Sequence, residues 1–160
     1  MSLIIDGYNL LHASGVFGAV REPRGFEASR VALLDMLVDV LGERAAGALV
    51  VFDAAHAPDG LPGRVVHGDL RVWFAREYPD ADTLIEQLVA EDTAPGHLVV
   101  VSSDRRVQAA ARRRRAKAVS CEDWLAAARA ARRPPRETGD AKPPEPGPEA
   151  VDEWKAYFGL

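Results

Sequence analysis

Short apolar runs alternate with longer amphipathic segments along most of the chain. Four runs rich in Val, Ile and Leu, and a weaker fifth, have the length of buried strands: Leu3–Ile5, Ala48–Phe52, Leu70–Phe74, Leu98–Val101 and Ala118–Val119. Apolar residues recur at helical spacing in four further segments: Phe26–Leu41, Ala81–Glu91, Arg105–Ala116 and Glu122–Ala131. Strands joined by helices of this length pair in parallel through right-handed crossovers. The pattern therefore predicts an α/β fold with a mostly parallel sheet that helices cover on both faces.

Two stretches depart from this alternation. Residues 54–69, between the second and third runs, are expected to form a loop. Residues 133–148 contain six prolines, which exclude a helix or an inner strand and predict a semi-extended linker. Apolar residues return in 149–160, which predicts a short amphipathic segment that docks on this chain's own surface, or else on a partner's. The expected organisation is one folded domain over 1–132, then the Pro-rich linker, then the C-terminal segment.

The composition is that of an ordinary globular protein with one domain. The 160 residues are 48% apolar and 28% charged, which is enough for one proper core. No apolar run reaches about 18 residues, and the first residues are typical of a strand rather than of a signal peptide. The single cysteine, Cys121, excludes an internal disulfide, and no Cys and His spacing indicates a zinc site. We expect a cytoplasmic protein.

Charge is unevenly distributed along the chain. The formal net charge of −4 argues against a polyanionic partner, but seven of the 20 basic residues lie in 105–117, which has no acidic residue. A concentrated basic face can bind phosphate locally on an otherwise acidic molecule. The candidate contacts with nucleic acid are Arg105, Arg106 and Arg112, which begin beside Asp104, and the alternative is a solvated helix face.

Aspartates stand where several of the predicted strands end. Asp6 and Asp53 directly follow two of the apolar runs, and Asp104 follows a third after two serines. Asp82 opens a predicted helix, with Glu86 one turn further on the same face. Because the carboxyl ends of parallel strands meet at one edge of a sheet, where ligands bind, we expect these carboxylates to converge.

A converging set of carboxylates needs a counter-charge, since like charges repel and burial raises their pKa values. Mg²⁺ and Mn²⁺ prefer oxygen ligands, and either ion can activate a water and neutralise charge on a phosphodiester. Taken singly, Asp104 is a good helix N-cap and Asp6 a good turn residue. Their repeated position at one sheet edge favours a shared chemical role.

Other residues near these acids each have two interpretations. Asn9 either binds a metal water or a phosphate or hydrogen-bonds its own turn. Ser102 and Ser103 either assist a carboxylate or satisfy the backbone of their loop. Tyr8 either stacks on a nucleobase or packs beneath its loop. Trp73 and Trp124 are expected to be packing residues.

Four short blocks of the sequence together resemble the signature of a known family. The blocks are Asp6-Gly7-Tyr8-Asn9, Val51-Phe52-Asp53-Ala54, Ala81-Asp82-Thr83-Leu84-Ile85-Glu86 and Ser103-Asp104-Arg105. They resemble NYN domains, which are PIN-like nucleases, and their order and spacing are most similar to the YacP-like branch. The resemblance covers 1–132. It implies a three-layer α/β/α sandwich with a mostly parallel five-stranded sheet, Mg²⁺ or Mn²⁺ at its edge, and cleavage of single-stranded RNA.

The resemblance also implies roles for individual residues. Asp6, Asp82 and Asp104 would form the catalytic metal site. Four residues would support it: Asn9, Asp53, Glu86 and Ser103. One characterised member of the branch is a ribosome-associated mRNA endoribonuclease, so mRNA and the ribosome become candidate partners. This chain departs from the pattern at Asp80, where Thr is common, in the weakly basic stretch 54–69, and in its Pro-rich tail.

Two other classes of protein, receiver domains and aspartyl-phosphate phosphatases, fit the sequence less well. Two further classes, RNA-binding adaptors and toxins, remain open. A phosphoacceptor receiver domain needs a lysine at a late strand end, where this chain has arginines. A phosphatase of the aspartyl-phosphate type needs a second aspartate two residues after Asp6, where Tyr8 stands. A non-catalytic RNA-binding adaptor and a PIN-type toxin remain alternatives. The intact acids favour an enzyme, because a binder of polyanions gains nothing from negative charge in its crevice.

Overall fold

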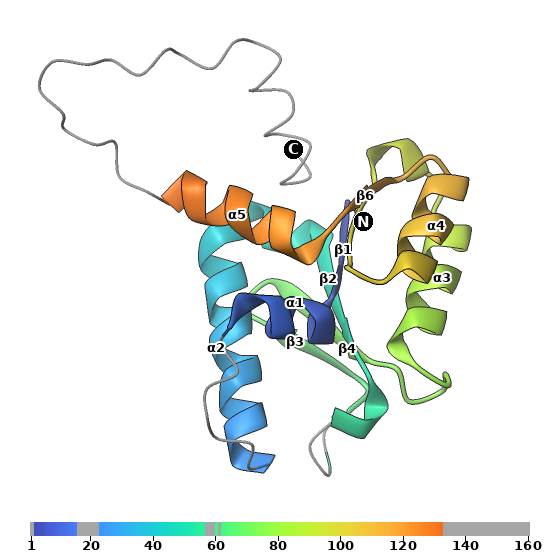
Figure 1. Cartoon of the computed structure of the whole chain (residues 1–160). Helices are drawn as coiled ribbons and strands as arrows, with labels where there is room; N and C mark the ends of the chain where they lie inside the picture. The colour runs from blue at the N-terminus through green and yellow to red at the C-terminus, as the bar shows by residue number, and fades with distance from the viewer. Residues whose placement is uncertain (1, 16–22, 57–59, 61, 133–160) are drawn as a thin grey trace, which may run out of the picture.

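The strands of the computed structural model, which describes residues 2–15, 23–56, 60 and 62–132, form one six-stranded sheet (Figure 1). The strands are β1 (Leu3–Asp6), β2 (Ala48–Phe52), β3 (Arg64–His67), β4 (Leu70–Phe74), β5 (Val99–Val101) and β6 (Lys117–Val119). Their order across the sheet is β3-β4-β2-β1-β5-β6. Every neighbouring pair is parallel except β3 and β4, which are antiparallel.

Helices cover the sheet on both faces. The helices are α1 (Gly7–Ser14), α2 (Pro23–Leu41), α3 (Ala81–Glu91), α4 (Arg105–Arg113) and α5 (Cys121–Arg132), with short 3₁₀ turns at Gly42–Gly47, Ala54–His56 and Pro95–His97. Figure 1 shows α1, α2 and α5 on one side of the sheet and α3 and α4 on the other. The predicted α/β class with a three-layer, mostly parallel architecture is confirmed.

The predicted number of five strands is wrong by one, because β3 lies in the stretch 54–69 that we expected to be a loop. This strand is at the edge of the sheet, and Val66 on it is 68% exposed, so it lacks the strong apolar signal of an inner strand. A two-residue turn, Gly68-Asp69, joins β3 to β4, and Gly68 has φ 62°. A pair of valines followed by this Gly-Asp turn is the local signal for the hairpin.

Helix α1 was also not among the expected elements. It begins immediately after β1, because the Asp6 carboxylate accepts a hydrogen bond from the Asn9 backbone N–H and caps the helix. It ends at Gly15, whose φ of 69° is the left-handed conformation that terminates helices. The chain from 6 to 9 is therefore both a helix start and part of the sheet edge.

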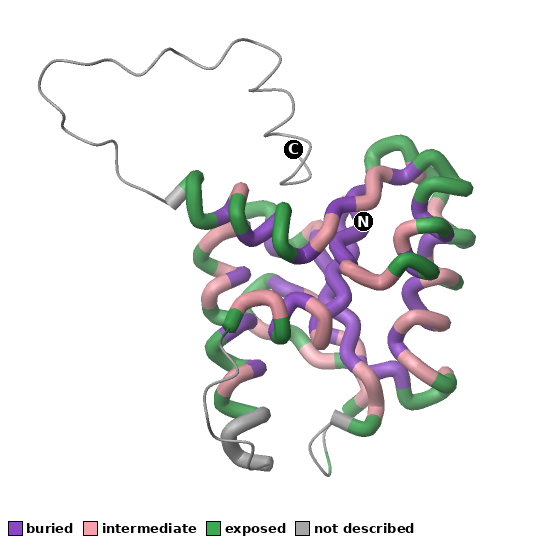
Figure 2. The backbone as a smooth tube through the Cα atoms, in the orientation of Figure 1, coloured by how far each residue is buried: buried purple, intermediate pink, exposed green. Residues whose placement is uncertain are grey.

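Two hydrophobic cores hold the layers together, one on each face of the sheet. Alternate residues of a strand point to opposite faces, so Leu3 and Ile5 pack against α1, α2 and α5, and Ile4 packs against α3 and α4. Strands β1, β2 and β5 are buried along their whole length, as the purple centre of Figure 2 shows. This rigid centre sets the positions of the residues at its carboxyl edge.

The predicted linker and C-terminal segment, 133–148 and 149–160, lie outside the described residues. Within the part of the chain that is described, each helix is too short or too polar to cross a lipid bilayer.

Substitution of Gly7 by alanine tests the close packing between β2 and the start of α1. A Cβ at Gly7 would lie 2.6–2.8 Å from three ring atoms of Phe52, which is fully buried. We expect Gly7→Ala to lower the free energy of unfolding by about 1–3 kcal/mol, measured by urea denaturation. Gly96→Ala is the matched control, because nothing lies within 4 Å of its added Cβ, and a change as large as that of Gly7→Ala would contradict this account.

Candidate functional site

The carboxyl edge of the central strands gathers the predicted acids. Strand β1 lies between β2 and β5: the connection that follows β1 leads to β2 on one side, whereas the connection that follows β4 leads to β5 on the other. In open α/β sheets, ligands bind in the crevice outside the strand ends where the connections reverse in this way. Asp6 is the last residue of β1, Asp53 follows β2, and Asp104 follows β5. The parallel register aligns these strand ends, with Asp6 opposite Val51. The three aspartates therefore reach the same edge from separate strands.

Asp6 is the buried centre of this edge, with 1% of its surface exposed. Its Oδ2 accepts hydrogen bonds from Asn9 Nδ2 at 2.7 Å and from Ser102 Oγ at 2.9 Å. Burial raises the pKa of Asp6 to about 6, and the nearby charge of Asp53 raises it too, while the hydrogen bonds from Ser102 and Asn9 oppose the rise. The carboxylate is thus rigidly held and costly to ionise.

Ser102 joins Asp6 to the turn that carries Asp104. Its hydroxyl is buried, donates to Asp6 and accepts from the backbone N–H of Asp104 at 3.1 Å. Asp104 Oδ1 in turn accepts from the backbone N–H groups of Arg106 and Val107 at 2.8 and 3.2 Å, which confirms it as the N-cap of α4. Asp104 therefore starts a helix and also lies close enough to Asp82 for its charge to raise the pKa of Asp82.

Asp82 faces the same crevice from the first turn of α3. Its pKa is raised to about 6, chiefly by burial and also by the charges of Asp6, Asp104 and Asp80, which the charge of Arg106 partly opposes. These interactions connect Asp82 with both other predicted metal ligands. The three carboxylates come from β1, α3 and the turn before α4, and the charge of Asp82 is repelled by both of the others.

Asp53 and Asp80 fix the start of α3, in addition to placing negative charge near Asp6 and Asp82. Asp53 Oδ1 accepts a hydrogen bond from the Ala81 backbone N–H at 2.5 Å, which ties α3 to the end of β2. Asp80 caps the helix by accepting from the backbone N–H and hydroxyl of Thr83 at 2.7 and 2.6 Å. This local arrangement sets where Asp82 lies relative to the sheet.

The described acids fit a divalent cation that binds through one or two carboxylates and keeps waters as its other ligands. Among residues 2–15, 23–56, 60 and 62–132, no three His, Cys, Asp or Glu side chains are placed to hold a metal ion together. A direct three-carboxylate ligand set is therefore not formed. Mg²⁺ often keeps several waters and binds through one or two carboxylates, and crowded acids with raised pKa values suit such an ion.

Two predicted supporting residues interact away from the crevice. Ser103 Oγ donates to Glu122 Oε2 at 2.8 Å and accepts from the Cys121 backbone N–H at 3.2 Å, so it organises the start of α5. The hydroxyl that contacts Asp6 belongs to its neighbour Ser102. Glu86 forms an ion pair with the Arg106 guanidinium and links α3 to α4.

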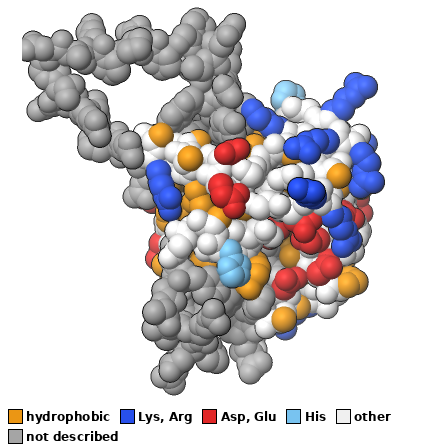
Figure 3. All heavy atoms as spheres, viewed as in Figure 1, with side chains coloured by type: hydrophobic (Ala, Val, Ile, Leu, Met, Phe, Trp, Pro, Cys, Tyr) orange, Lys and Arg blue, Asp and Glu red, His pale blue; other side chains and the backbone are white. Residues whose placement is uncertain are grey.

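The predicted basic residues divide into engaged and exposed groups. Arg106 contacts Glu86, Asp80 and Thr83, so its charge is already paired. Arg105 and Arg112 are exposed on α4. The helix ends at Arg113 rather than continuing to Ala116, and Arg114 donates to the Asp92 carbonyl at 2.8 Å. Figure 3 shows acidic side chains next to a belt of basic ones on the side of α3 and α4.

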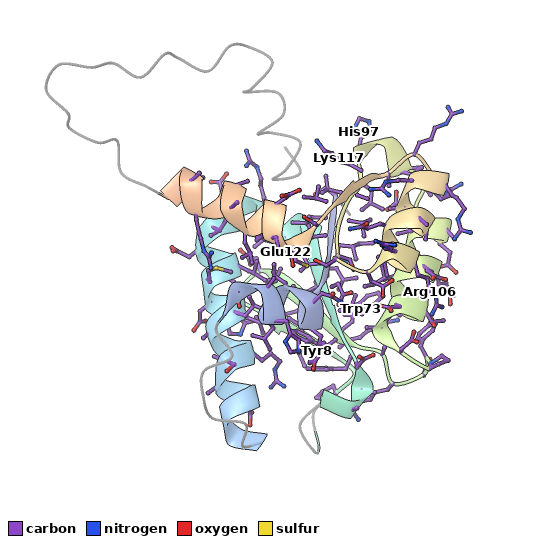
Figure 4. The ribbon with its side chains drawn as sticks, in the orientation of Figure 1. Tyr8, Trp73, His97, Arg106, Lys117 and Glu122 are labelled. Atoms are coloured by element: carbon purple, nitrogen blue, oxygen red, sulfur yellow. The ribbon has the colours of Figure 1, made fainter. Side chains whose placement is uncertain are left out.

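Tyr8 lies on α1, half-buried, with its ring edge-to-face with the ring of His12 at 4.4 Å between centroids. Figure 4 shows Tyr8 on α1 and Arg106 on α4, the helices that flank the crevice on opposite faces of the sheet. Tyr8 is therefore close to the sheet edge and partly accessible there.

A three-layer α/β domain with crowded acids at the carboxyl edge and arginines on the adjoining helix has the architecture of PIN-like nuclease domains. The chain belongs to the YacP-like NYN domain family, whose family model matches residues 3–155. This is a family of nuclease-like, RNA-binding domains.

Two solved structures are similar to the chain. Rae1 (YacP) from Bacillus subtilis is 26% identical with a TM-score of 0.59, over 81% of this chain and 74% of that one. Its W164L mutant is 26% identical with a TM-score of 0.55, over 80% and 74%. No curated protein sequence matches the chain.

The raised pKa of Asp82 predicts how stability depends on pH. Its folded-state pKa of about 6 lies above its ordinary value of 3.8, so the folded state holds a proton that the unfolded state has released. Asp82 therefore lowers the free energy of unfolding as pH rises from about 4 to about 6. We expect Asp82→Asn to remove this contribution, measured by urea denaturation at several pH values in EDTA.

Glu91→Gln, at the exposed end of the same helix, is the control and is expected to retain the wild-type pH dependence. If the free energy of unfolding depends on pH equally in Asp82→Asn and in the wild type, the pKa of Asp82 is not raised in the folded state.

Proposed function

We propose that the chain is a divalent-metal-dependent endoribonuclease that cleaves single-stranded RNA. The observation that carries this proposal is the convergence of Asp6, Asp82 and Asp104 from three elements on one crevice, with the pKa values of Asp6 and Asp82 raised to about 6. Such crowding destabilises the empty fold and has no benefit for a protein that only binds polyanions. Membership of the YacP-like NYN family and the likeness to Rae1 support the same class of activity.

The proposed metal is Mg²⁺ or Mn²⁺, held by one or two of Asp6, Asp82 and Asp104 with waters completing its shell. When bound, such an ion lowers the pKa of a water and neutralises charge on a phosphodiester. Other side chains of the protein position the proposed metal ligands. Ser102 and Asn9 orient the Asp6 carboxylate, and Asp53 holds the helix that carries Asp82.

Substrate binding is assigned to exposed groups around the crevice. Arg105 and Arg112 are exposed on α4 and are proposed to contact RNA phosphates. Tyr8 is a candidate stacking surface on the other side. Arg106 instead keeps α3 and α4 together through Glu86 and Asp80. An mRNA is a candidate substrate and the ribosome a candidate partner, and the free thiol of Cys121 accords with the cytoplasm as the compartment.

Cleavage assays test the proposal directly. We expect the full chain to cleave an end-labelled single-stranded RNA with Mn²⁺ or Mg²⁺, and EDTA to abolish the activity. Asp82→Asn and Asp104→Asn are each expected to reduce the rate by roughly 100-fold or more, as loss of a charge-stabilising group does in other enzymes. Asparagine also caps helices, so Asp104→Asn preserves the start of α4.

Glu91→Gln again serves as control, with wild-type activity expected. RNA binding without metal-dependent cleavage would favour the adaptor alternative. Cleavage that survives EDTA and both aspartate substitutions would contradict the assignment of the site.

Ser102→Ala tests whether the buried hydroxyl positions Asp6. Loss of its hydrogen bond removes an interaction that lowers the pKa of Asp6, so this pKa is expected to rise. We expect a roughly tenfold loss of activity, with the acid limb of the pH–rate profile moved to higher pH. Ser103→Ala is the matched control, because its hydroxyl bonds to Glu122, and an equal pH shift in both variants would contradict the role of Ser102.

A further inference from the structure

A pocket of about 250 Å³ lies beside the acidic edge, between the β3–β4 hairpin and the start of α3. Its walls include three aromatic residues, two arginines, one glutamate and one leucine: Trp73, Phe74, Tyr78, Arg64, Arg76, Glu77 and Leu84. The pocket is smaller than the roughly 300–1,000 Å³ that usually holds a drug-sized ligand, so it suits a single flat group. The proposed active site does not use any of these residues.

Trp73 provides a flat surface in this pocket. It packs partly against the core under α3 and α4, unlike Trp124, which is wholly buried. The guanidinium carbon of Arg64 lies 4.0 Å from the centre of the Trp73 ring, so the cation stacks on the aromatic face. Figure 4 shows Trp73 between β4 and α3. Unpaired nucleobases stack on aromatic rings and on arginine guanidinium planes, so the exposed Arg64 guanidinium over Trp73 offers a stacking surface.

The charge of the pocket also fits a nucleic acid. Arg64 and Arg76 outnumber the single acidic side chain, Glu77, and Arg64 and Arg76 are both exposed. A phosphate-bearing chain gains from the two cations, and its bases gain from the rings.

The pocket and the acids lie along one continuous edge. Adjacent strands are about 4.8 Å apart, which places β4 roughly 10 Å from β1 across β2. Ala75, just beyond β4, donates its backbone N–H to the Phe52 carbonyl at 2.9 Å, immediately before Asp53. Tyr78 precedes Asp80 and Asp82 by two and four residues. An RNA strand with a phosphate at the acids therefore brings a neighbouring base to the pocket.

We propose that this pocket holds one unpaired base of the single-stranded RNA next to the scissile phosphate, stacked on the Trp73 and Arg64 platform. This proposal rests on the proposed ribonuclease function and names where its substrate is held. Such a pocket selects single strands, because a paired base is stacked within a duplex and cannot enter.

Binding measurements on an inactive full-length parent, Asp104→Asn, test the pocket in the presence of Mg²⁺. The probes are a fluorescein-labelled oligouridine of about ten nucleotides and an abasic ribose-phosphate strand of the same length, followed by fluorescence anisotropy. Adding Trp73→Leu is expected to weaken oligouridine binding roughly tenfold and to change abasic-strand binding less than about twofold. A merely structural defect would weaken both equally.

Arg64→Gln provides a second variant, because Arg64 is exposed and its loss leaves the core intact if Trp73→Leu proves unstable in thermal unfolding. It is expected to weaken oligouridine binding several-fold. Arg44→Gln, exposed in the 3₁₀ turn that precedes β2, is the matched charge control and is expected to bind as the parent does.

The outcomes separate this inference from the proposed function. Tight binding by the parent that neither Trp73→Leu nor Arg64→Gln weakens overturns the pocket and leaves the nuclease proposal standing. If both variants bind oligouridine more weakly but bind the abasic strand as before, and the wild-type chain does not cleave RNA, the pocket is supported and the nuclease proposal is overturned. No RNA binding by the parent overturns the pocket, and the absence of cleavage by the wild-type chain as well overturns both proposals.

Discussion

The burial of one carboxylate at the end of an apolar strand is the constraint on which the candidate site depends. Asp6 ends β1 in the middle of the sheet, where its neighbours on both sides are buried. Its ionised form is destabilised by burial and by the charge of Asp53, and it is stabilised by hydrogen bonds from Ser102 and Asn9. The sheet thus holds a charge where water is scarce, and hydrogen bonds alone do not restore its ordinary pKa.

The acids around Asp6 separate into two kinds. Asp53, Asp80 and Asp104 accept backbone hydrogen bonds and set where α3 and α4 begin. The negative charges of its neighbours raise the pKa of Asp82. The positive charge of Arg106 offsets this only in part, because Arg106 is also paired with Glu86. The same polar contacts that build the fold therefore bring the site's negative charges together. A fold that already tolerates this crowding is suited to a cation that relieves it.

The family comparison and the physical arguments support each other at different levels. Membership of the YacP-like NYN family defines the class of domain, and the likeness to Rae1 extends over most of both chains. The geometry adds which hydroxyl serves Asp6, which arginines are already paired, and where an aromatic platform adjoins the acids. Together they describe an edge with a charged centre and a pocket lined by aromatic and arginine side chains next to it, which suits the proposed cleavage of single-stranded RNA.

The sequence by itself determined the fold class and the set of candidate acids, because apolar periodicity and the residue after each strand are local features. It missed β3, whose edge position leaves Val66 exposed, and it favoured Ser103 over Ser102. Only the tertiary structure decided that choice, the pairing of Arg106 with Glu86, and the pocket at Trp73. Each of these depends on distances between segments far apart in the chain, which the packing of helices on the sheet sets and no local pattern encodes.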